Sequence, residues 1–114
     1  MHFFHPQMAW GNNTTFKLIS GAGCFLVTCN TRVYIIRNGT TGSPTIRRLS
    51  NHGEVLDDSF YYDKENAILY MAAAEGTPMV TLLPLFFSSA LDIVFEITKE
   101  DVTQFDKIKL VSDN

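Results

Sequence analysis

The chain has little charge and no excess of basic residues. Charged residues make up 18% of its 114 residues and apolar residues 46%, a balance that excludes a disordered chain. Basic residues number 9 and acidic residues 12, which gives a net charge of −3. A domain that binds nucleic acid on its own usually carries a basic excess, because it must neutralise phosphates. The composition therefore predicts no specific nucleic-acid binding by this chain alone.

Long apolar runs are also absent. No stretch reaches the ~18 consecutive apolar residues of a membrane-spanning helix, so we predict no membrane association. The first ten residues, MHFFHPQMAW, contain no Lys or Arg and no long apolar stretch, which predicts that they are not a secretory signal. We therefore expect an intracellular protein. A length of 114 residues suits one domain.

Only two cysteines are present, Cys24 and Cys29, and they are five residues apart. If residues 24–29 form a strand, the odd separation places the two side chains on opposite faces, so they cannot bridge each other. We predict two free thiols in a reducing compartment. Cys-x4-Cys without a second pair is not a zinc signature, and the histidines at positions 2, 5 and 52 are scattered. The sequence thus predicts neither a metal nor a cofactor.

Aromatic residues, in contrast, are plentiful. Nine Phe, four Tyr and one Trp stand against only twenty-one charged residues. Large exposed apolar patches usually mark interfaces, so part of this surface could be buried by another chain. An aromatic-rich core explains the same composition, and both interpretations stay open here.

Short strands separated by turn signals fill the sequence from position 15. The apolar and β-branched runs lie at 15–20, 24–29, 32–37, 45–50, 54–62 and 67–74. Residues 21–23, Gly-Ala-Gly, are predicted to be a hairpin turn, and residues 38–39, Asn-Gly, give a strong turn signal between β-branched runs. Residues 63–66, Asp-Lys-Glu-Asn, form a charged turn. Residues 67–74 are apolar on both faces, which predicts burial on both sides.

The periodicity changes after position 76. Thr77 is a good N-cap and Pro78 suits the first helical position, so we predict a helix over about 78–90 that Pro84 kinks or ends. Thr98 with Asp101 gives a second, weaker helix start. The expected organisation is an irregular arm, 1–14, followed by one β-rich barrel domain, 15–114, with a C-terminal helical segment. The fold class is α+β with mostly antiparallel sheet.

No arrangement of residues predicts catalysis. Asp57 and Asp58 are adjacent, so in a strand they point to opposite faces and cannot chelate one ion together. A solvated strand end explains them better. Arg47 and Arg48 are far short of a basic patch. Because no nucleophile, base or metal cage can be nominated, we predict that the chain is not an enzyme.

Two stretches of the sequence carry a resemblance to a known family. The first is AILYMAAAEGTPMVTLLPLF, residues 67–86, where an apolar strand precedes a Thr-Pro helix start. The second is KEDVTQFDKIKLVSDN, residues 99–114, which closes in Val-x-Asp-Asn. Together they resemble the N-terminal domain of the B-type accessory subunit of eukaryotic ribonuclease H2, which is non-catalytic. With the opening strands the resemblance covers residues 16–114. Pro84 inside the expected helix departs from the family pattern.

The resemblance implies that the chain is half of an intertwined triple barrel. Its partners would be a chain like the C-type accessory subunit of that enzyme, which shares the barrel, and a chain like its catalytic subunit, which cuts at ribonucleotides in DNA or in RNA–DNA hybrids. A nuclear location follows with that function. The residues then expected at the partner interface are Val33, Ile35, Phe60, Tyr62, Ile68, Leu69, Tyr70 and Met71.

Other functions stay open. Repeated short strands are also typical of a self-contained β-barrel module that binds another molecule, or of a fragment of a β-propeller that mediates protein–protein interaction. A self-contained module should fold as a monomer, whereas a domain of the B-type accessory subunit should need its partner.

Overall fold

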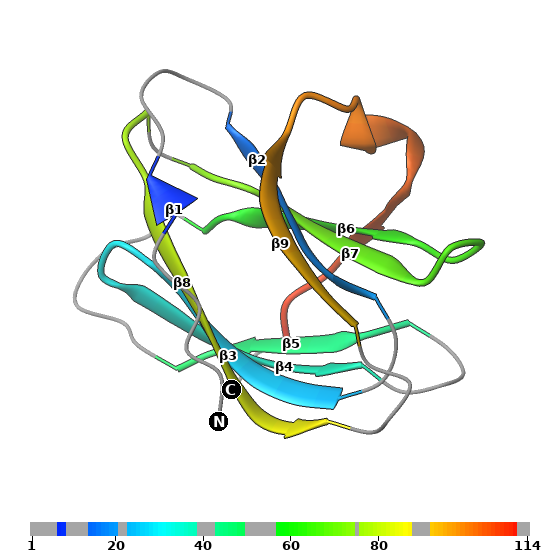
Figure 1. Ribbon diagram of the computed structural model, residues 1–114, viewed down its shortest axis with the longest axis horizontal. Helices are drawn as coiled ribbons and strands as arrows, with labels where there is room; N and C mark the ends of the chain where they lie inside the picture. The colour runs from blue at the N-terminus through cyan, green and yellow to red at the C-terminus, as the bar shows by residue number, and fades with distance from the viewer. Residues whose placement is uncertain are drawn as a thin grey trace.

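Short strands with short connections make up most of the chain in the computed structural model, which describes residues 7–8, 14–20, 23–38, 43–49, 57–74, 76–87 and 92–111. Figure 1 shows the strands and one 3₁₀ helix within these ranges. Their bounds are β1 Gln7–Met8, β2 Thr15–Ser20, β3 Gly23–Cys29, β4 Arg32–Asn38, β5 Thr45–Arg48, β6 Ser59–Asp63, β7 Ile68–Ala72, β8 Met79–Phe87, β9 Asp92–Thr98, η1 Val102–Gln104 and β10 Asp106–Ile108.

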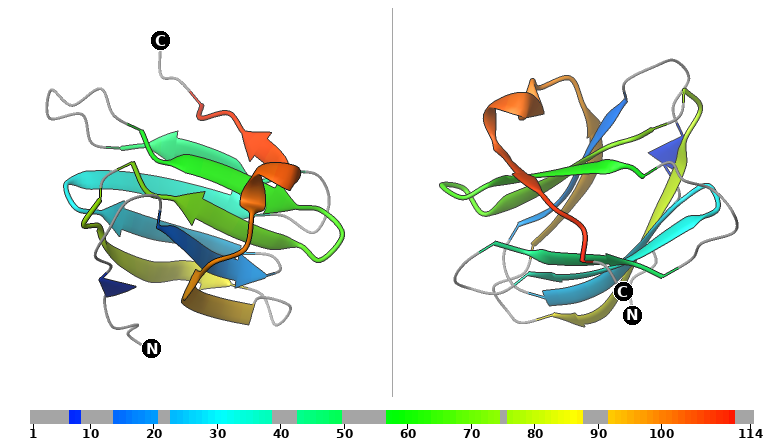
Figure 2. Two further views of the ribbon diagram at one scale, coloured as in Figure 1. Left: turned by 90° about the horizontal axis from the view of Figure 1, so that it is seen from above. Right: turned by 180° about the vertical axis from the view of Figure 1, so that it is seen from behind.

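The strands form two five-stranded sheets that face each other (Figures 1 and 2). Sheet A has the order β1-β8-β3-β4-β5, and sheet B has the order β10-β6-β7-β2-β9. All the pairings between these strands are antiparallel. The mostly antiparallel sheet predicted from the sequence is therefore confirmed, whereas the α part of the predicted α+β class is not found among the described residues. The arm predicted as irregular contributes β1, which pairs with β8 at two positions.

Apolar side chains from both sheets fill the space between them. Strict alternation along β3 and β4 produces the sheet A half of this core, because every second side chain of a strand points to the same face. The buried cluster consists of Phe16, Leu18, Ile19, Phe25, Val27, Cys29, Tyr34, Ile36, Ile46, Phe60, Tyr62, Leu69, Met71, Val80 and Leu82. One chain thus encloses a core of its own.

β7 is buried on both faces, as its sequence predicts. Leu69 and Met71 are fully buried in the core between the sheets, while Tyr70 lies on the opposite face and is 2% exposed. The ring of Phe105 stacks on the Tyr70 ring, with centroids 5.4 Å apart and an angle of 5° between the planes. The second face of β7 is therefore covered by the C-terminal segment of the same chain.

The segment predicted to be a helix, residues 78–90, is a strand over Met79–Phe87, and that prediction is wrong. Val80 and Leu82 are buried, whereas Met79 and Leu83 are exposed, a two-residue period that fits a strand. Pro84 would cost ~3 kcal/mol inside a helix. In β8 it sits beside a register shift, because Phe25 faces Pro84 while Cys24 faces Phe86. Proline is tolerated at such bulges, so the strand accommodates it.

Two hairpins connect neighbouring strands, and the hairpin predicted at residues 21–23 is not formed. β3 and β4 form a hairpin through Asn30, whose φ of 55° suits asparagine. β6 and β7 form a second hairpin, where an Asp63 carboxylate oxygen accepts hydrogen bonds from the amides of Glu65 and Asn66. The Gly-Ala-Gly turn is not a hairpin, because β2 pairs in sheet B and β3 in sheet A. The prediction failed because turn residues do not specify which strands pair.

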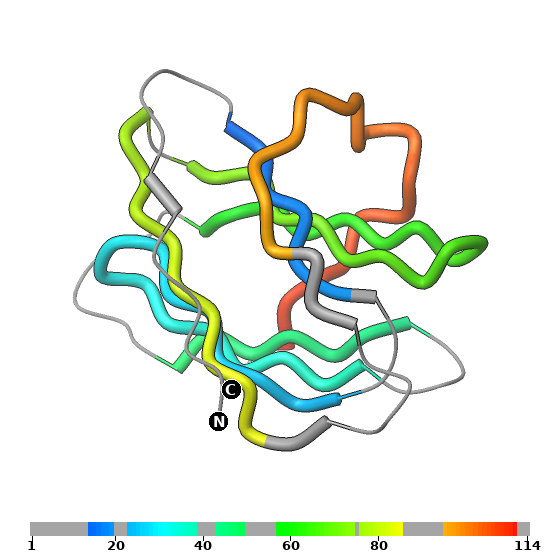
Figure 3. Tube along the Cα trace, viewed as in Figure 1, coloured from blue at the N-terminus to red at the C-terminus, as the bar shows by residue number. Residues whose placement is uncertain are grey.

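The C-terminal segment links the two sheets. Asp101 caps η1 by accepting from the Thr103 amide, so the second predicted helix start gives a single 3₁₀ turn. β10 then pairs with β6 at the edge of sheet B. Farther on, Val111 forms a parallel bridge with Arg47, and its amide donates to the Ile46 carbonyl at 2.8 Å. Figure 3 shows this course from one sheet to the other.

Candidate functional site

The interface residues predicted from the sequence fall into two groups. Phe60, Tyr62, Leu69 and Met71 lie in the core of their own chain. Tyr70 is covered by Phe105. These five side chains are buried within their own chain, and the partner interface predicted for them stays a prediction. Burial on both faces of a strand does not by itself reveal which chain provides the cover.

The other predicted residues remain accessible. Val33 and Ile35 are half-buried on the outer face of sheet A, and Ile68 is half-buried in β7. Only Val33 and Ile35 lie on a surface with further exposed apolar side chains. They therefore lead to the first candidate site.

We call this surface the sheet A face. Cross-strand register sets its central row, because Leu26 of β3 faces Leu83 of β8 on one side and Ile35 of β4 on the other. In the next row Thr28 lies between Thr81 and Val33, and the two threonine hydroxyls hydrogen-bond to each other. Among the described side chains, this face consists of Cys24, Leu26, Thr28, Val33, Ile35, Arg37, Thr45, Arg47, Leu49, Met79, Thr81, Leu83 and Leu85.

Large apolar side chains on this face are exposed to solvent. Leu49 is 53% exposed, Leu85 52%, Met79 43% and Leu83 38%. They flank the half-buried Leu26 and Ile35, so the apolar surface spans β8, β3 and β4 and continues at Leu49, which follows β5. Single exposed leucines are ordinary, but a contiguous apolar sheet face is typical of an interaction surface.

Charge is distributed unevenly between the two sheets. All four arginines of the chain lie in strands of sheet A, and none of the Asp and Glu residues that the structure describes does. Arg37 and Arg47 are exposed on the sheet A face. Arg32 and Arg48 are on the opposite side of the sheet and pair with Asp58 and Asp57. The sheet A face therefore combines apolar residues with positive charge.

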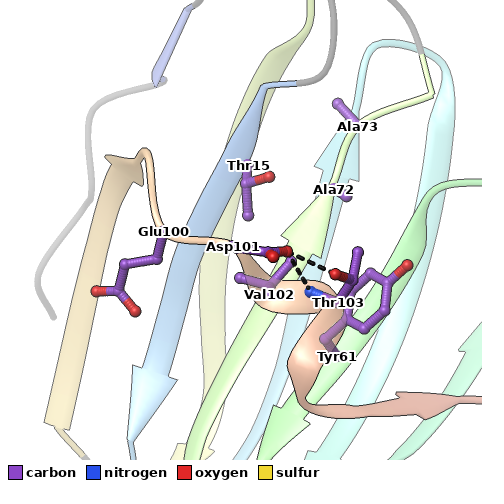
Figure 4. Close-up of a pocket in the computed structure, with 8 residues that line it drawn as sticks. All are labelled: Thr15, Tyr61, Ala72, Ala73, Glu100, Asp101, Val102 and Thr103. Atoms are coloured by element: carbon purple, nitrogen blue, oxygen red, sulfur yellow. Dashed lines mark hydrogen bonds between the residues drawn. The ribbon is translucent and has the colours of Figure 1, made fainter.

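A second candidate is a small pocket on the outer side of sheet B (Figure 4). It has a volume of about 300 Å³ and lies between β2, β6, β7 and the η1 segment. Its lining is Thr15, Tyr61, Ala72, Ala73, Glu100, Asp101, Val102 and Thr103. The two alanines leave the space that larger side chains would fill.

The acidic residues of this pocket are engaged within the chain. Asp101 accepts from the amide and hydroxyl of Thr103, and these hydrogen bonds lower the pKa of Asp101. Glu100 accepts from the Tyr70 hydroxyl at 2.9 Å and lies 3.8 Å from Lys17. Figure 4 shows the Glu100 carboxylate directed away from the pocket. These carboxylates therefore stabilise local structure.

The third candidate is a polar cluster inside the molecule. Arg32 donates from Nε to Asp58 Oδ2 at 2.8 Å and from Nη2 to Asp58 Oδ1 at 3.0 Å. The Tyr34 hydroxyl donates to Oδ2, and the Ala74 amide donates to Oδ1, each at 2.8 Å. The prediction that Asp58 is solvated is wrong, because it is 2% exposed; Asp57 is exposed, so the two do occupy opposite faces.

This cluster does not activate its cysteine. Burial, and then the nearby Asp58 charge, raise the pKa of the Cys29 thiol to about 12, so it stays protonated near neutral pH. A protonated buried thiol is a poor nucleophile. Cys24 lies on the opposite face of β3 and both thiols are free, which confirms the predicted geometry. The cluster joins sheet A to the start of β6, which is a structural role.

Comparisons with protein-family models, curated proteins and solved structures gave no match to this chain. In the described ranges no group of three His, Cys, Asp or Glu side chains could hold a metal ion. The three histidines considered from the sequence lie outside those ranges. No helix among the described residues is long and apolar enough to span a membrane.

Sequence reasoning missed most of the sheet A face. The misassigned helix hid Met79, Leu83 and Leu85, although their alternation with Val80 and Leu82 was available as a signal. No local sequence pattern indicated the ion pair of Arg32 and Asp58, because the two residues are 26 positions apart.

Proposed function

We propose that this chain is a non-catalytic interaction module that binds a partner protein through the sheet A face. The observation that carries the proposal is the row of Leu83, Leu26 and Ile35, flanked by exposed Leu49 and Leu85. Such a row of aliphatic side chains on a sheet face suits the desolvated centre of a protein interface. Flanking arginines suit its rim, because arginine is enriched at interfaces.

The edge strands of both sheets are poorly suited to pairing with another chain, which favours a sheet face as the binding surface. On one side of the molecule, β10 and the Val111 bridge lie along β6 and β5. On the other side, Pro84 removes a backbone donor from β8, and β9 has a register shift against β2 between Ile93 and Glu96. Prolines and bulges protect edge strands from pairing with other chains. We therefore expect a partner to bind against the sheet A face and not to add a strand at a sheet edge.

At finer detail, we propose the scaffold role implied by the resemblance to the B-type accessory subunit of ribonuclease H2. In that role the chain joins a partner like the C-type accessory subunit and supports a chain like the catalytic subunit, in the nucleus. The apolar sheet A face supports binding of another protein chain. The half-barrel architecture receives less support, because the chain encloses its own core and because residues 79–87, the expected family helix, form a strand.

A self-contained binding module is the second candidate, and the enclosed core favours it. Fifteen buried side chains from both sheets form one cluster without any partner chain. A β-propeller fragment is not favoured, since a blade is one four-stranded sheet and this chain has two facing sheets of five. Both candidates bind through the same face and differ in whether the isolated chain folds.

The test compares two matched substitutions. Leu83→Asp alters the sheet A face, and Ile97→Asp alters a similarly exposed apolar residue of sheet B, with exposures of 38% and 42%. Each variant is co-expressed with the catalytic and C-type accessory subunits of ribonuclease H2, and complexes are isolated by size exclusion. The proposed scaffold role predicts a complex with wild type and Ile97→Asp but none with Leu83→Asp. A failure of wild type to bind would reject the ribonuclease H2 assignment and leave the binding-module candidate.

A separate assay tests whether the chain lacks nuclease activity. The purified chain is incubated with Mg²⁺ and a duplex that contains one ribonucleotide. We expect the duplex to stay intact. Cleavage that Asp57→Asn removes would reject a purely scaffolding role.

A further inference from the structure

We propose that the pocket on the outer side of sheet B binds a primary ammonium group on a short apolar stem, which Asp101 and Thr15 hold (Figure 4). Two sources carry this chemistry, a small free amine and a lysine side chain of another protein. The pocket belongs to a different sheet from the sheet A face, so its ligand is independent of the proposed function.

Thr15 places a buried hydroxyl on the wall of the pocket. The residue is 9% exposed, and within the described part of the chain no group hydrogen-bonds to its side chain. Cross-strand register sets Thr15 directly beside Ala72, whose small side chain leaves room next to the hydroxyl. In Figure 4 this hydroxyl is directed toward Ala72, whereas the Glu100 carboxylate is directed away from the pocket. Because a buried polar group without a partner is costly, the Thr15 hydroxyl marks the position of a hydrogen-bonding ligand.

Asp101 adds a negative charge that forms no ion pair with a described residue. Its Oδ1 accepts from the amide and the hydroxyl of Thr103, and these hydrogen bonds lower the pKa of Asp101, so the carboxylate is ionised at neutral pH. Neither bond uses Oδ2. The neighbouring Glu100 is instead engaged by the Tyr70 hydroxyl and by Lys17. A cation that enters the pocket therefore meets the Asp101 carboxylate.

The rest of the pocket is small and largely apolar. Ala72, Ala73, Val102 and the ring of Tyr61 contribute to its lining. Its volume of about 300 Å³ is at the lower end of the ~300–1,000 Å³ of ligand pockets, which suits a short chain and not a nucleotide-sized cofactor. An ammonium group has only N–H donors, so a carboxylate and a hydroxyl oxygen are matching acceptors. Its alkyl stem then packs on the alanines and the Tyr61 ring.

Other ligands match the pocket less well. A divalent metal ion requires several oxygen ligands, and no group of three His, Cys, Asp or Glu side chains among the described residues could hold one. An anion is repelled by the Asp101 charge. A quaternary ammonium has no N–H group to donate to the Thr15 hydroxyl. A primary ammonium meets each of these requirements.

The test is a titration of the isotope-labelled chain with n-butylammonium, followed through its amide chemical shifts. We expect the shifts to cluster at the residues around the pocket. Binding should be at least roughly tenfold tighter than that of n-butanol, which has the same stem without charge or ammonium donors. Butyltrimethylammonium keeps the charge without an N–H group and should also bind more weakly. Added salt should weaken the binding of butylammonium, because Asp101 is exposed.

A second titration, with Nα-acetyl-lysine methylamide, identifies the source of the ammonium group. This compound presents a lysine side chain on a peptide backbone. Tighter binding than that of butylammonium supports the site with a lysine of another protein as its ligand. Weaker binding supports the site with a free amine as its ligand, because the backbone then obstructs entry.

Matched variants show whether the shifts arise from this pocket. Thr15→Val removes the hydroxyl and keeps the shape of the side chain, so affinity for butylammonium should fall roughly tenfold. Ala72→Leu fills the pocket and should abolish binding. Asp101→Asn removes the charge but keeps an oxygen that can cap η1, and affinity should fall at least roughly threefold. Asp106→Asn removes another exposed charge, on β10 and outside the pocket lining, and should bind like wild type.

The dispersion of each variant's own amide spectrum reports whether it is folded. Thr15→Val and Ala72→Leu alter different strands, so either one decides the matter if the other fails to fold. Binding that Thr15→Val, Ala72→Leu and Asp101→Asn leave unchanged would overturn the ammonium site. Equal binding of n-butanol or butyltrimethylammonium, or no shifts with millimolar concentrations of either amine, would overturn it as well.

Discussion

Arg32 Nε lies 2.8 Å from Asp58 Oδ2, and both side chains are fully buried. This ion pair connects β4 of sheet A to the residue that precedes β6 of sheet B. Each charge is compensated by the other, and Tyr34 and the Ala74 amide satisfy further acceptor positions of the carboxylate. A buried pair of this kind holds the sheets together only while both partners are present.

Removing one partner should therefore be strongly destabilising. We expect Arg32→Leu to lower the free energy of unfolding by about 3–5 kcal/mol, because it leaves the Asp58 charge buried without compensation. Urea denaturation followed by circular dichroism measures the change. Arg32→Leu/Asp58→Leu should recover much of the loss, since neither charge remains. An equally unstable double variant would mean that packing, not charge, determines the effect.

The two cysteines should differ in reactivity in the folded protein. Cys24 is half-buried on the sheet A face, while Cys29 is buried and its thiol pKa is raised to about 12. At pH 8, iodoacetamide should modify Cys24 much faster, because the thiolate is the reactive form. Mass spectrometry should find one modification in the native protein and two in urea. Equal rates in the native state would contradict the buried position of Cys29.

Alkaline pH should destabilise the protein through Tyr70. Burial, followed by the hydrogen bond to Glu100, raises the pKa of Tyr70 from 10.0 to about 12. Between these values the folded state holds a proton that the unfolded state has lost, so stability falls as pH rises from about 10 to about 12. Urea melts across this range test it. Tyr70→Phe keeps the stack on Phe105 and should make the decline less steep. Burial also raises the pKa values of Cys29 and Tyr34, so both groups contribute to the decline, and Cys29→Ala and Tyr34→Phe separate their contributions.

Local patterns in the sequence were sufficient to predict the positions of most strands. Alternation or continuous apolarity predicted the strands at 15–20, 24–29, 32–37 and 67–74, because those patterns reflect the two faces of a strand. The helix over 78–90 was predicted because Thr77 and Pro78 outweighed the alternation of β8. The strand forms instead because β3 provides seven paired positions for it.

Contacts between residues far apart in the chain could not be predicted from the sequence. The pairing of β2 with β7 and β9, rather than with β3, depends on the whole sheet order. The burial of Asp58 depends on Arg32, and the cover of Tyr70 depends on Phe105, 35 positions later in the chain. The resemblance placed much of the partner interface on β7, and that placement stays a prediction. The structure leaves apolar side chains of the sheet A face exposed.

The last prediction concerns whether the isolated chain folds. Leu69 is fully buried between the sheets, so Leu69→Asp places a lone charge in the core, at a cost of at least several kcal/mol. Small domains are stable by only ~5–15 kcal/mol, so we expect the isolated variant to be largely unfolded. Leu83→Asp, on the sheet A face, and Glu65→Lys, in the turn after β6, should keep wild-type thermal transitions.

Circular dichroism melts of the three isolated variants and of wild type check this expectation. A cooperative transition for wild type that Leu69→Asp alone abolishes would support a core formed within one chain. If isolated wild type is unfolded and gains structure only with the C-type accessory subunit of ribonuclease H2, the enclosed core does not form in the monomer and the intertwined barrel is favoured. The position of Leu69 makes the two outcomes exclusive, since its side chain belongs to an intramolecular core in the first case and to an intersubunit core in the second.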